Sequence, residues 1–161
     1  MKGYQNILIA FFLYIVFMIE ILENIVSFEG KGDEIIEEIT NQPETQEFLI
    51  KVLQDQLFET GADGNGETLG KYSFLTVQIK RAKGQPTDRI TLVDTGEFYD
   101  SYFIDAFRGG FIIDADGEKE DSNLFDRYGD DILKPDEETL EEIGEFYKIK
   151  IYEYIQENIF C

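Results

Sequence analysis

The sequence predicts an α+β fold in which helices pack on a small antiparallel sheet made of one β-hairpin. Two segments, 43–60 and 136–155, carry apolar residues at three-to-four spacing, which is typical of helices that bury one face. Between them, residues 102–115 form two short apolar runs around a glycine turn, the pattern of a hairpin. With 161 residues, of which 43% are hydrophobic, the chain is long enough to bury one core. We therefore expect a single α+β domain over 33–161.

A hydrophobic N-terminal segment, residues 1–28, precedes that domain. Residues 7–19 are an unbroken apolar run, which is shorter than the roughly 20 residues that a membrane-spanning helix needs. No small-residue cleavage motif of a signal peptide follows, because residues 20–24 are acidic and bulky. We expect an extra helix that is buried against protein or packs between subunits. Association with a membrane is the less favoured alternative.

Two helices are expected after the linker at 29–32. Asp33 is placed to cap a short helix, which the residues around Pro43 interrupt. Proline suits the first turn of a helix, so the second helix begins at Pro43 and ends near Thr60. The apolar positions that predict the two buried faces are Ile35, Ile36, Ile39, Phe48, Leu49, Val52, Leu53 and Leu57.

A glycine-rich loop at 61–70 invites a phosphate-binding interpretation. Its spacing matches neither the phosphate-binding loop nor the dinucleotide-binding motif, so an ordinary loop is favoured. Residues 63–67 and 114–118 resemble calcium loops in composition, but both lack the glycine and the glutamate that an EF-hand requires. A solvated turn is favoured at both, with loosely bound Ca²⁺ or Mg²⁺ as the alternative, so we expect no cofactor and no specific metal site.

The only basic stretch of the chain follows this loop, with no acid between Lys71 and Gln85. Residues 72–83 read as a short helix capped by Ser73 or as a strand, and the helix is favoured. The basic residues are Lys71, Lys80, Arg81 and Lys83. Such a stretch can dock an acidic face of a neighbouring subunit, or it can neutralise the surface of its own monomer.

Three helices flank or follow the hairpin. Asp94 and Thr95 are placed to cap a short helix that reaches Ser101, and a brief helix is expected over 122–129. Asp136 is placed to cap the last helix. The expected apolar stripe of that helix is Leu140, Ile143, Tyr147, Ile151, Tyr154 and Ile155.

The composition narrows the possible functions. The chain has 34 acidic and 14 basic residues, so its net charge is −20, and nucleic acid is not an expected partner because phosphates are bound through Lys and Arg. It has no histidine, and its one cysteine, Cys161, has no evident activating neighbour. We therefore expect that the chain is not an enzyme. The acid-rich stretch 114–145 is either a solvated face or a surface that repels DNA.

Several short motifs lie in the middle of the chain. They are Gly70-Lys71-Tyr72-Ser73, residues 84–92, residues 94–101 with Thr95, Gly96 and Ser101, and Tyr128 to Leu133. Together they resemble the small neck, or tail-completion, proteins of tailed bacteriophages, including crAss-like and other phages of gut Bacteroidales. The resemblance covers roughly residues 44–159, and the hydrophobic N-terminus departs from it.

The resemblance implies a structural virion protein of the head–tail connector, assembled in the host cytoplasm. Copies arranged in a ring would join the portal to the tail, with other neck, tail and portal proteins as partners. DNA would pass an acidic lumen without being bound in a sequence-specific way. The candidate residues for subunit contacts are Phe11, Phe12, Tyr14, Phe17, Lys80, Arg81, Lys83, Tyr147 and Tyr154.

Two other classes of function stay open at this point. An acidic inhibitor would mimic DNA and bind a host DNA-binding protein, and it would compete with DNA for that protein. A small membrane-associated protein would be anchored by residues 7–28.

Overall fold

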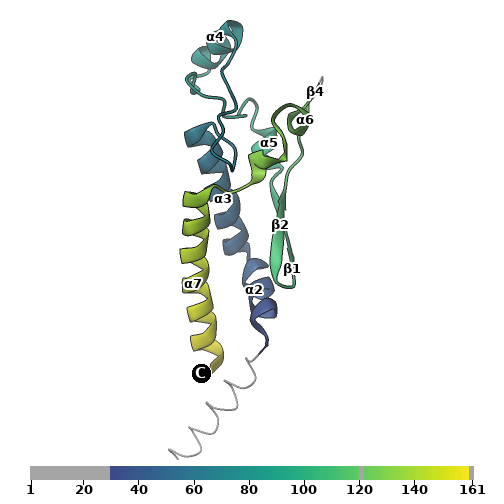
Figure 1. The fold of residues 1–161 in the computed structure, drawn as a ribbon, viewed down its shortest axis with the longest axis vertical. Coiled ribbons are helices and arrows are strands. Elements are labelled where there is room, and N and C mark those ends of the chain that lie inside the picture. The colour runs from purple at the N-terminus through teal and green to yellow at the C-terminus, as the bar shows by residue number, and fades with distance from the viewer. Residues whose placement is uncertain (1–29, 120–121, 160–161) are drawn as a thin grey trace, which may run out of the picture.

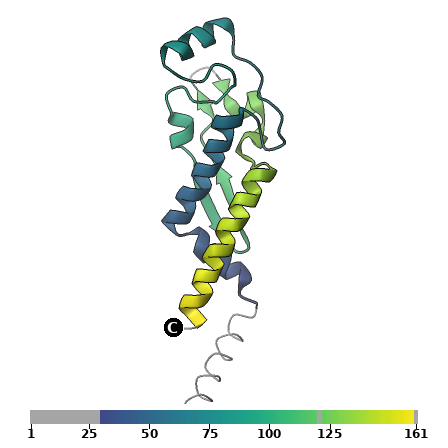
Figure 2. The same ribbon diagram turned by 90° about the vertical axis from the view of Figure 1, so that its left-hand side faces the viewer.

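Three helices run along the long axis of the molecule (Figures 1 and 2). The computed structural model describes residues 30–119 and 122–159. Within them, α2 spans Gly32–Thr40, α3 spans Pro43–Thr60 and α7 spans Glu137–Ile159. α7 lies beside α3 and runs in the opposite direction, so the two long helices form one side of the body (Figure 2).

The starts and ends of α2 and α3 follow from local chemistry. The predicted cap of α2 is wrong, because the helix begins at Gly32 without a side-chain cap bond and Asp33 lies in its first turn. A carboxylate there is still favourable, since it faces the positive end of the helix dipole. α3 begins at Pro43 as predicted, and Gly61 ends it with a φ of 62°, a left-handed conformation that glycine adopts without strain.

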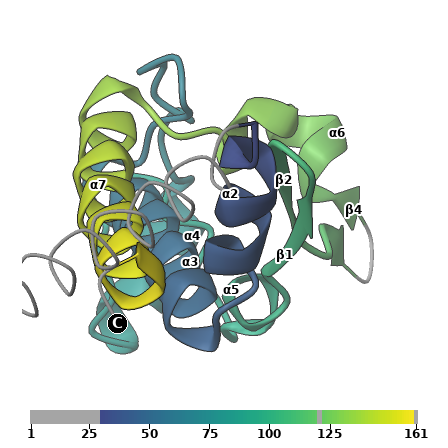
Figure 3. The same ribbon diagram turned by 90° about the horizontal axis from the view of Figure 1, so that it is seen from below.

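The predicted hairpin is confirmed, and with it the α+β class. β1 (Phe103–Phe107) pairs antiparallel with β2 (Gly110–Asp114) through a two-residue turn at 108–109. Ile104 and Phe111 are half-buried and pack against the core, because side chains alternate between the two faces of a strand. The hairpin lies against α2 and α3 on the side away from α7 (Figure 3).

Shorter elements lie at the end of the molecule that carries α4. The predicted short helices are confirmed as α4 (Phe74–Ala82), α5 (Glu97–Asp100) and α6 (Leu124–Tyr128). Two of their predicted starts are wrong, because Gly96 is the N-cap of α5, and residues 122–123 form a strand before α6. The cap of α4 is Ser73, whose hydroxyl accepts a hydrogen bond from the amide of Thr76 at 3.2 Å. The elements that the sequence did not predict are β3 (Glu118–Lys119), β4 (Ser122–Asn123) and the 3-10 helix η1 (Asp130–Leu133). They are too short to produce a periodic pattern.

Two apolar clusters form the core, and α3 contributes to both. The first consists of Ile35, Ile39, Leu49, Val52, Ile143 and Tyr147. The second consists of Leu53, Leu57, Phe98, Tyr102, Ala115 and Ile132. One position of the predicted α7 stripe is wrong: Leu140 is 54% exposed, and Thr139 is buried instead. Thr139 and Leu140 lie about 40° and about 60° around the helix axis from Ile143, so helical spacing alone does not decide which of the two is buried.

Candidate interaction surfaces

The predicted contact residues separate into several groups. The four aromatic candidates Phe11, Phe12, Tyr14 and Phe17 lie outside the described residues. Tyr147 lies in the core, and its hydroxyl is 2.6 Å from the hydroxyl of Thr40. Tyr154 is partly buried, and its hydroxyl donates to the Glu38 carboxylate at 2.7 Å, which raises the Tyr154 pKa. Both tyrosines therefore hold α7 against α2.

The three basic candidates also have different environments. Lys80 is 6% exposed, and its ammonium donates to Gln85 Oε1 at 3.1 Å and to the Val93 carbonyl. Lys83 forms an ion pair with Asp94 at 2.6 Å, which lowers the pKa of that carboxyl. Arg81 is exposed, and no acid in the described residues lies within ion-pair distance of it. Lys80 therefore fastens α4 to the body, and Arg81 is the cation left for a partner.

The outer face of α4 is apolar, which the sequence analysis missed. Phe74 is 81% exposed and Leu75 is 69% exposed, while Ile79, on the flank of the helix, is 48% exposed. Gln78 is exposed on the same side, because it lies one helical turn after Phe74. The helix projects at one end of the molecule (Figures 1 and 2). No local pattern in the sequence signals this orientation, because it depends on the burial of Lys80 against the rest of the chain.

The outer face of the hairpin is also apolar. Phe103, Phe107 and Ile112 are about half exposed, at 51%, 47% and 55%. Asp105 lies directly opposite Ile112, and Asp114 lies opposite Phe103, so two exposed carboxylates flank the apolar side chains. The alternation that buries Ile104 and Phe111 therefore leaves a second apolar surface with acidic neighbours.

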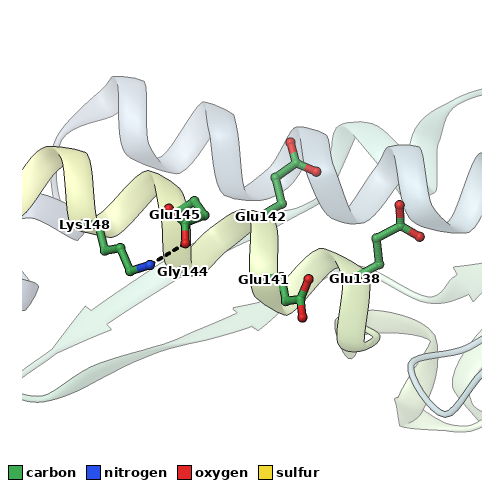
Figure 4. Close-up of a pocket in the computed structure, with 6 residues that line it drawn as sticks. All are labelled: Glu138, Glu141, Glu142, Gly144, Glu145 and Lys148. Carbon is green, nitrogen blue, oxygen red and sulfur yellow. Dashed lines mark hydrogen bonds and ion pairs between the residues drawn. The ribbon is translucent and has the colours of Figure 1, made fainter.

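The solvent side of α7 is acidic in its first half and apolar in its second. Glu138, Glu141 and Glu145 line an open hollow along the helix, and Glu145 is ion-paired with Lys148 (Figure 4). Further along the same helix, Ile149 is 58% exposed and Tyr152 is 62% exposed. Separations of three and four residues place these side chains on one line of the helix surface. We call Glu138, Glu141, Glu145, Ile149 and Tyr152 the α7 outer line.

A groove of about 370 Å³ lies beneath α4. Tyr72, Ile79 and Leu92 contribute apolar surface to it, and Lys119 and Arg127 contribute positive charge. Leu92 has a φ of 55°, a left-handed conformation that is uncommon for a residue with a branched side chain. The groove separates α4 from α6 and leaves Ile79 half exposed.

The two segments that resemble calcium loops are turns in which an aspartate carboxylate accepts hydrogen bonds from backbone amides of the same turn. Asp63 Oδ1 accepts hydrogen bonds from the amides of Asn65 and Glu67 at 2.9 and 3.0 Å. Asp116 Oδ1 accepts from the amide of Glu118 at 2.9 Å. In the part of the chain that the structure describes, no group of three or more Asp, Glu, His or Cys residues is arranged to hold a metal ion.

The motif Thr95, Gly96 and Ser101 has a structural role. The Thr95 hydroxyl donates to the Glu97 carboxylate at 2.9 Å at the start of α5. The Ser101 hydroxyl donates to the Phe98 carbonyl at 2.7 Å and accepts from the amide of Asp116 at 2.8 Å. These bonds fix α5 and connect the start of the hairpin to the segment that follows it.

No protein-family model, no curated protein and no solved structure matches this chain. Among residues 30–119 and 122–159, no helix combines the length and the apolar character needed to cross a membrane.

Proposed function

We propose that this chain is a structural protein of a tailed-phage neck, one copy of an oligomeric ring that joins the portal to the tail. The observation that carries the proposal is the distribution of exposed large apolar side chains. In the described residues they fall on three elements: α4, the hairpin and α7. Exposed apolar surface of this extent marks sites of protein–protein contact. A ring subunit needs several such sites, because it has a neighbour on each side and partners above and below.

Two further features support the same function. The motifs that resemble tail-completion proteins fix local structure here, as Thr95 and Ser101 do, which suits a protein that acts through its interfaces. A net charge of −20 also suits a channel through which DNA slides, since like charges prevent adhesion.

The test is to purify phage particles of the encoding system by density and to search them for this chain by antibody and by peptide mass spectrometry. We expect a fixed copy number per particle that is consistent with a ring. Absence of the chain from particles that package DNA and attach tails normally would refute the proposal.

The acidic row on α7 favours a second candidate, an inhibitor that mimics DNA. Glu138 and Glu141 carry negative charge without an ion-pair partner in the described residues, as the phosphates of a DNA strand do (Figure 4). That function gives no role to the apolar surfaces of α4 and the hairpin. It requires that the purified chain displace DNA from a host DNA-binding protein, which the neck protein does not do.

A further inference from the structure

The α4 face combines apolar surface with an unpaired positive charge. Phe74 and Leu75 lie side by side at the start of the helix, and both are more than two-thirds exposed. Arg81 lies near its end, and Lys71 precedes it; neither has an ion-pair partner in the described residues. We call Phe74, Leu75, Gln78 and Arg81 the α4 face. A surface with large apolar side chains at its centre and cations at its rim is typical of a protein interface.

This face is held in a fixed orientation. The buried ammonium of Lys80 bonds Gln85 and the Val93 carbonyl, and it lies 5.0 Å from the centre of the Tyr72 ring. The ion pair between Lys83 and Asp94 adds a second attachment. A surface that is already ordered loses less entropy on binding, so its apolar residues contribute more to affinity.

The α7 outer line has the complementary chemistry. Glu138 and Glu141 have no ion-pair partner in the described residues, and Ile149 and Tyr152 follow them along the same line. The two carboxylates can therefore form ion pairs with the cations of the α4 face, and the two large apolar side chains can pack against Phe74 and Leu75. Helices pack against one another along lines of this spacing.

We infer that the α4 face of one copy binds the α7 outer line of a second copy of this chain. The inference rests on the ring proposed above and names the contact that builds it. The charge of the chain indicates which surface the α4 face binds. A chain with a net charge of −20 repels a second copy of itself over most of its surface. The stretch from Lys71 to Gln85 is the one basic stretch of the sequence. Attraction between two copies is therefore strongest where this stretch of one copy contacts the carboxylates of the α7 outer line of the other.

The two surfaces lie on different elements, and this fixes the type of assembly. Neither surface is complementary to itself, so each copy uses α4 toward one neighbour and α7 toward the other. Contacts of this head-to-tail type close into a ring or extend into a filament. The outer face of the hairpin, with Asp105 and Asp114, is the competing acceptor for α4.

Charge reversal in the full-length chain tests the contact, with self-association measured by sedimentation velocity. Arg81→Glu alone and Glu141→Arg alone should each lower the association constant by about tenfold, because each places like charges together. An equimolar mixture of the two variants should recover association to within about threefold of the wild type, since every contact in an alternating assembly again pairs opposite charges. Lys31→Glu changes an exposed cation directly before α2, and it is the matched control that should change nothing.

Cross-linking gives a second measurement that does not depend on charge. In a Cys161→Ser background, which removes the only cysteine, Gln78→Cys is mixed with Glu141→Cys or with Asp105→Cys and treated with a short bis-maleimide. We expect covalent dimers from the Gln78 and Glu141 pair and none from either variant alone. Dimers from the Gln78 and Asp105 pair instead, a wild-type chain that stays monomeric, or a charge-reversed mixture that does not recover would each overturn the inference.

A failure of these interface tests can be told apart from a failure of the proposed neck function. Incorporation into particles is read by mass spectrometry and does not require that α4 be the contact. A chain present in particles whose purified form fails the charge-reversal test retains the neck function and loses this interface.

Discussion

The hydroxyl groups of Thr40 and Tyr147 lie 2.6 Å apart inside the core and join the end of α2 to the middle of α7. Thr40 also donates to the Ile36 carbonyl at 2.7 Å, so the Tyr147 hydroxyl is the donor in the bond between the two side chains. A residue considered for subunit contacts is thus a connection between two helices of the same chain. The ring of Tyr147 additionally stacks on Phe111 of the hairpin, with ring centres 6.2 Å apart.

Replacing Tyr147 by Phe should lower the free energy of unfolding by about 1 kcal/mol, because the ring stays and one buried hydrogen bond is lost. Urea unfolding measures the change. The double variant Thr40→Val with Tyr147→Phe should lose less than the sum of the two single changes, since no buried group is left without its partner. Strict additivity would show that the two hydroxyls do not interact.

Three tyrosines should make the fold sensitive to alkaline pH. Burial raises the pKa of Tyr99, Tyr102 and Tyr147 above the usual value of about 10. Above that pH the unfolded chain loses these protons and the folded chain keeps them, so the unfolded state binds fewer protons. The free energy of unfolding should therefore fall as pH rises beyond about 10, by up to ~1.4 kcal/mol per pH unit for each tyrosine.

Urea titrations on either side of pH 10 measure this slope, and tyrosinate absorbance shows how many tyrosines ionise late. Tyr102→Phe is the informative variant, because its buried hydroxyl has no hydrogen-bond partner in the described residues. This variant should reduce the slope of the free energy of unfolding against pH. At neutral pH the free energy of unfolding should stay unchanged or rise by up to about 1 kcal/mol. A large loss at neutral pH would mean that the hydroxyl is satisfied in solution.

Replacing Lys80 by Met should loosen α4 without unfolding the body. The Val93 carbonyl would lose its donor, at a cost of about 1–3 kcal/mol that is concentrated at this end of the molecule. Hydrogen exchange followed by mass spectrometry should show faster exchange over residues 74–82. Measured at concentrations where the chain is monomeric, Arg81→Met, the neighbouring exposed cation, should leave exchange unchanged. Equal effects of the two variants would contradict the anchoring role of Lys80.

Adding a side chain to Gly61, the glycine that ends α3, should cost more stability than adding one to Gly66. Gly61 has a φ of 62°, and a Cβ there would lie 2.7 Å from Arg89 Cβ. Gly66 has a φ of 77° with open space around it. Gly66→Ala should therefore cost only the roughly 1–2 kcal/mol of the left-handed backbone, and Gly61→Ala should cost more. Urea unfolding of the two variants gives the difference, and equal losses would show that Arg89 moves aside.

The sequence predicted the elements whose signals are local. Pro43, the glycine turn of the hairpin and Asp136 each define an element boundary, and the Asp136 carboxylate does accept from the amide of Thr139 at 2.8 Å. Periodicity also placed the buried side of α3 correctly. The two-residue strands β3 and β4 were not predicted, because their pairing depends on tertiary position.

The interaction surfaces were harder to predict from the sequence. A lysine is normally exposed and a phenylalanine normally buried, so Lys80 was considered for contacts and Phe74 was not. In the structure Lys80 is buried and Phe74 is exposed, because the Val93 carbonyl and Gln85 provide two hydrogen-bond acceptors for the Lys80 ammonium. Whether a helix buries its charged or its apolar side depends on what the rest of the chain places beneath it, which periodicity alone does not contain.

The position of α4 has a consequence for the polarity of any assembly. α4 lies at one end of the long axis, and the chain enters α2 at the other (Figure 1). A ring of parallel copies would therefore have two unlike rims, one next to α4 and one where the hydrophobic N-terminal segment joins the domain. Such a ring has a direction, and each rim can accept only the partner that matches it, which determines the order in which a multi-protein structure is built.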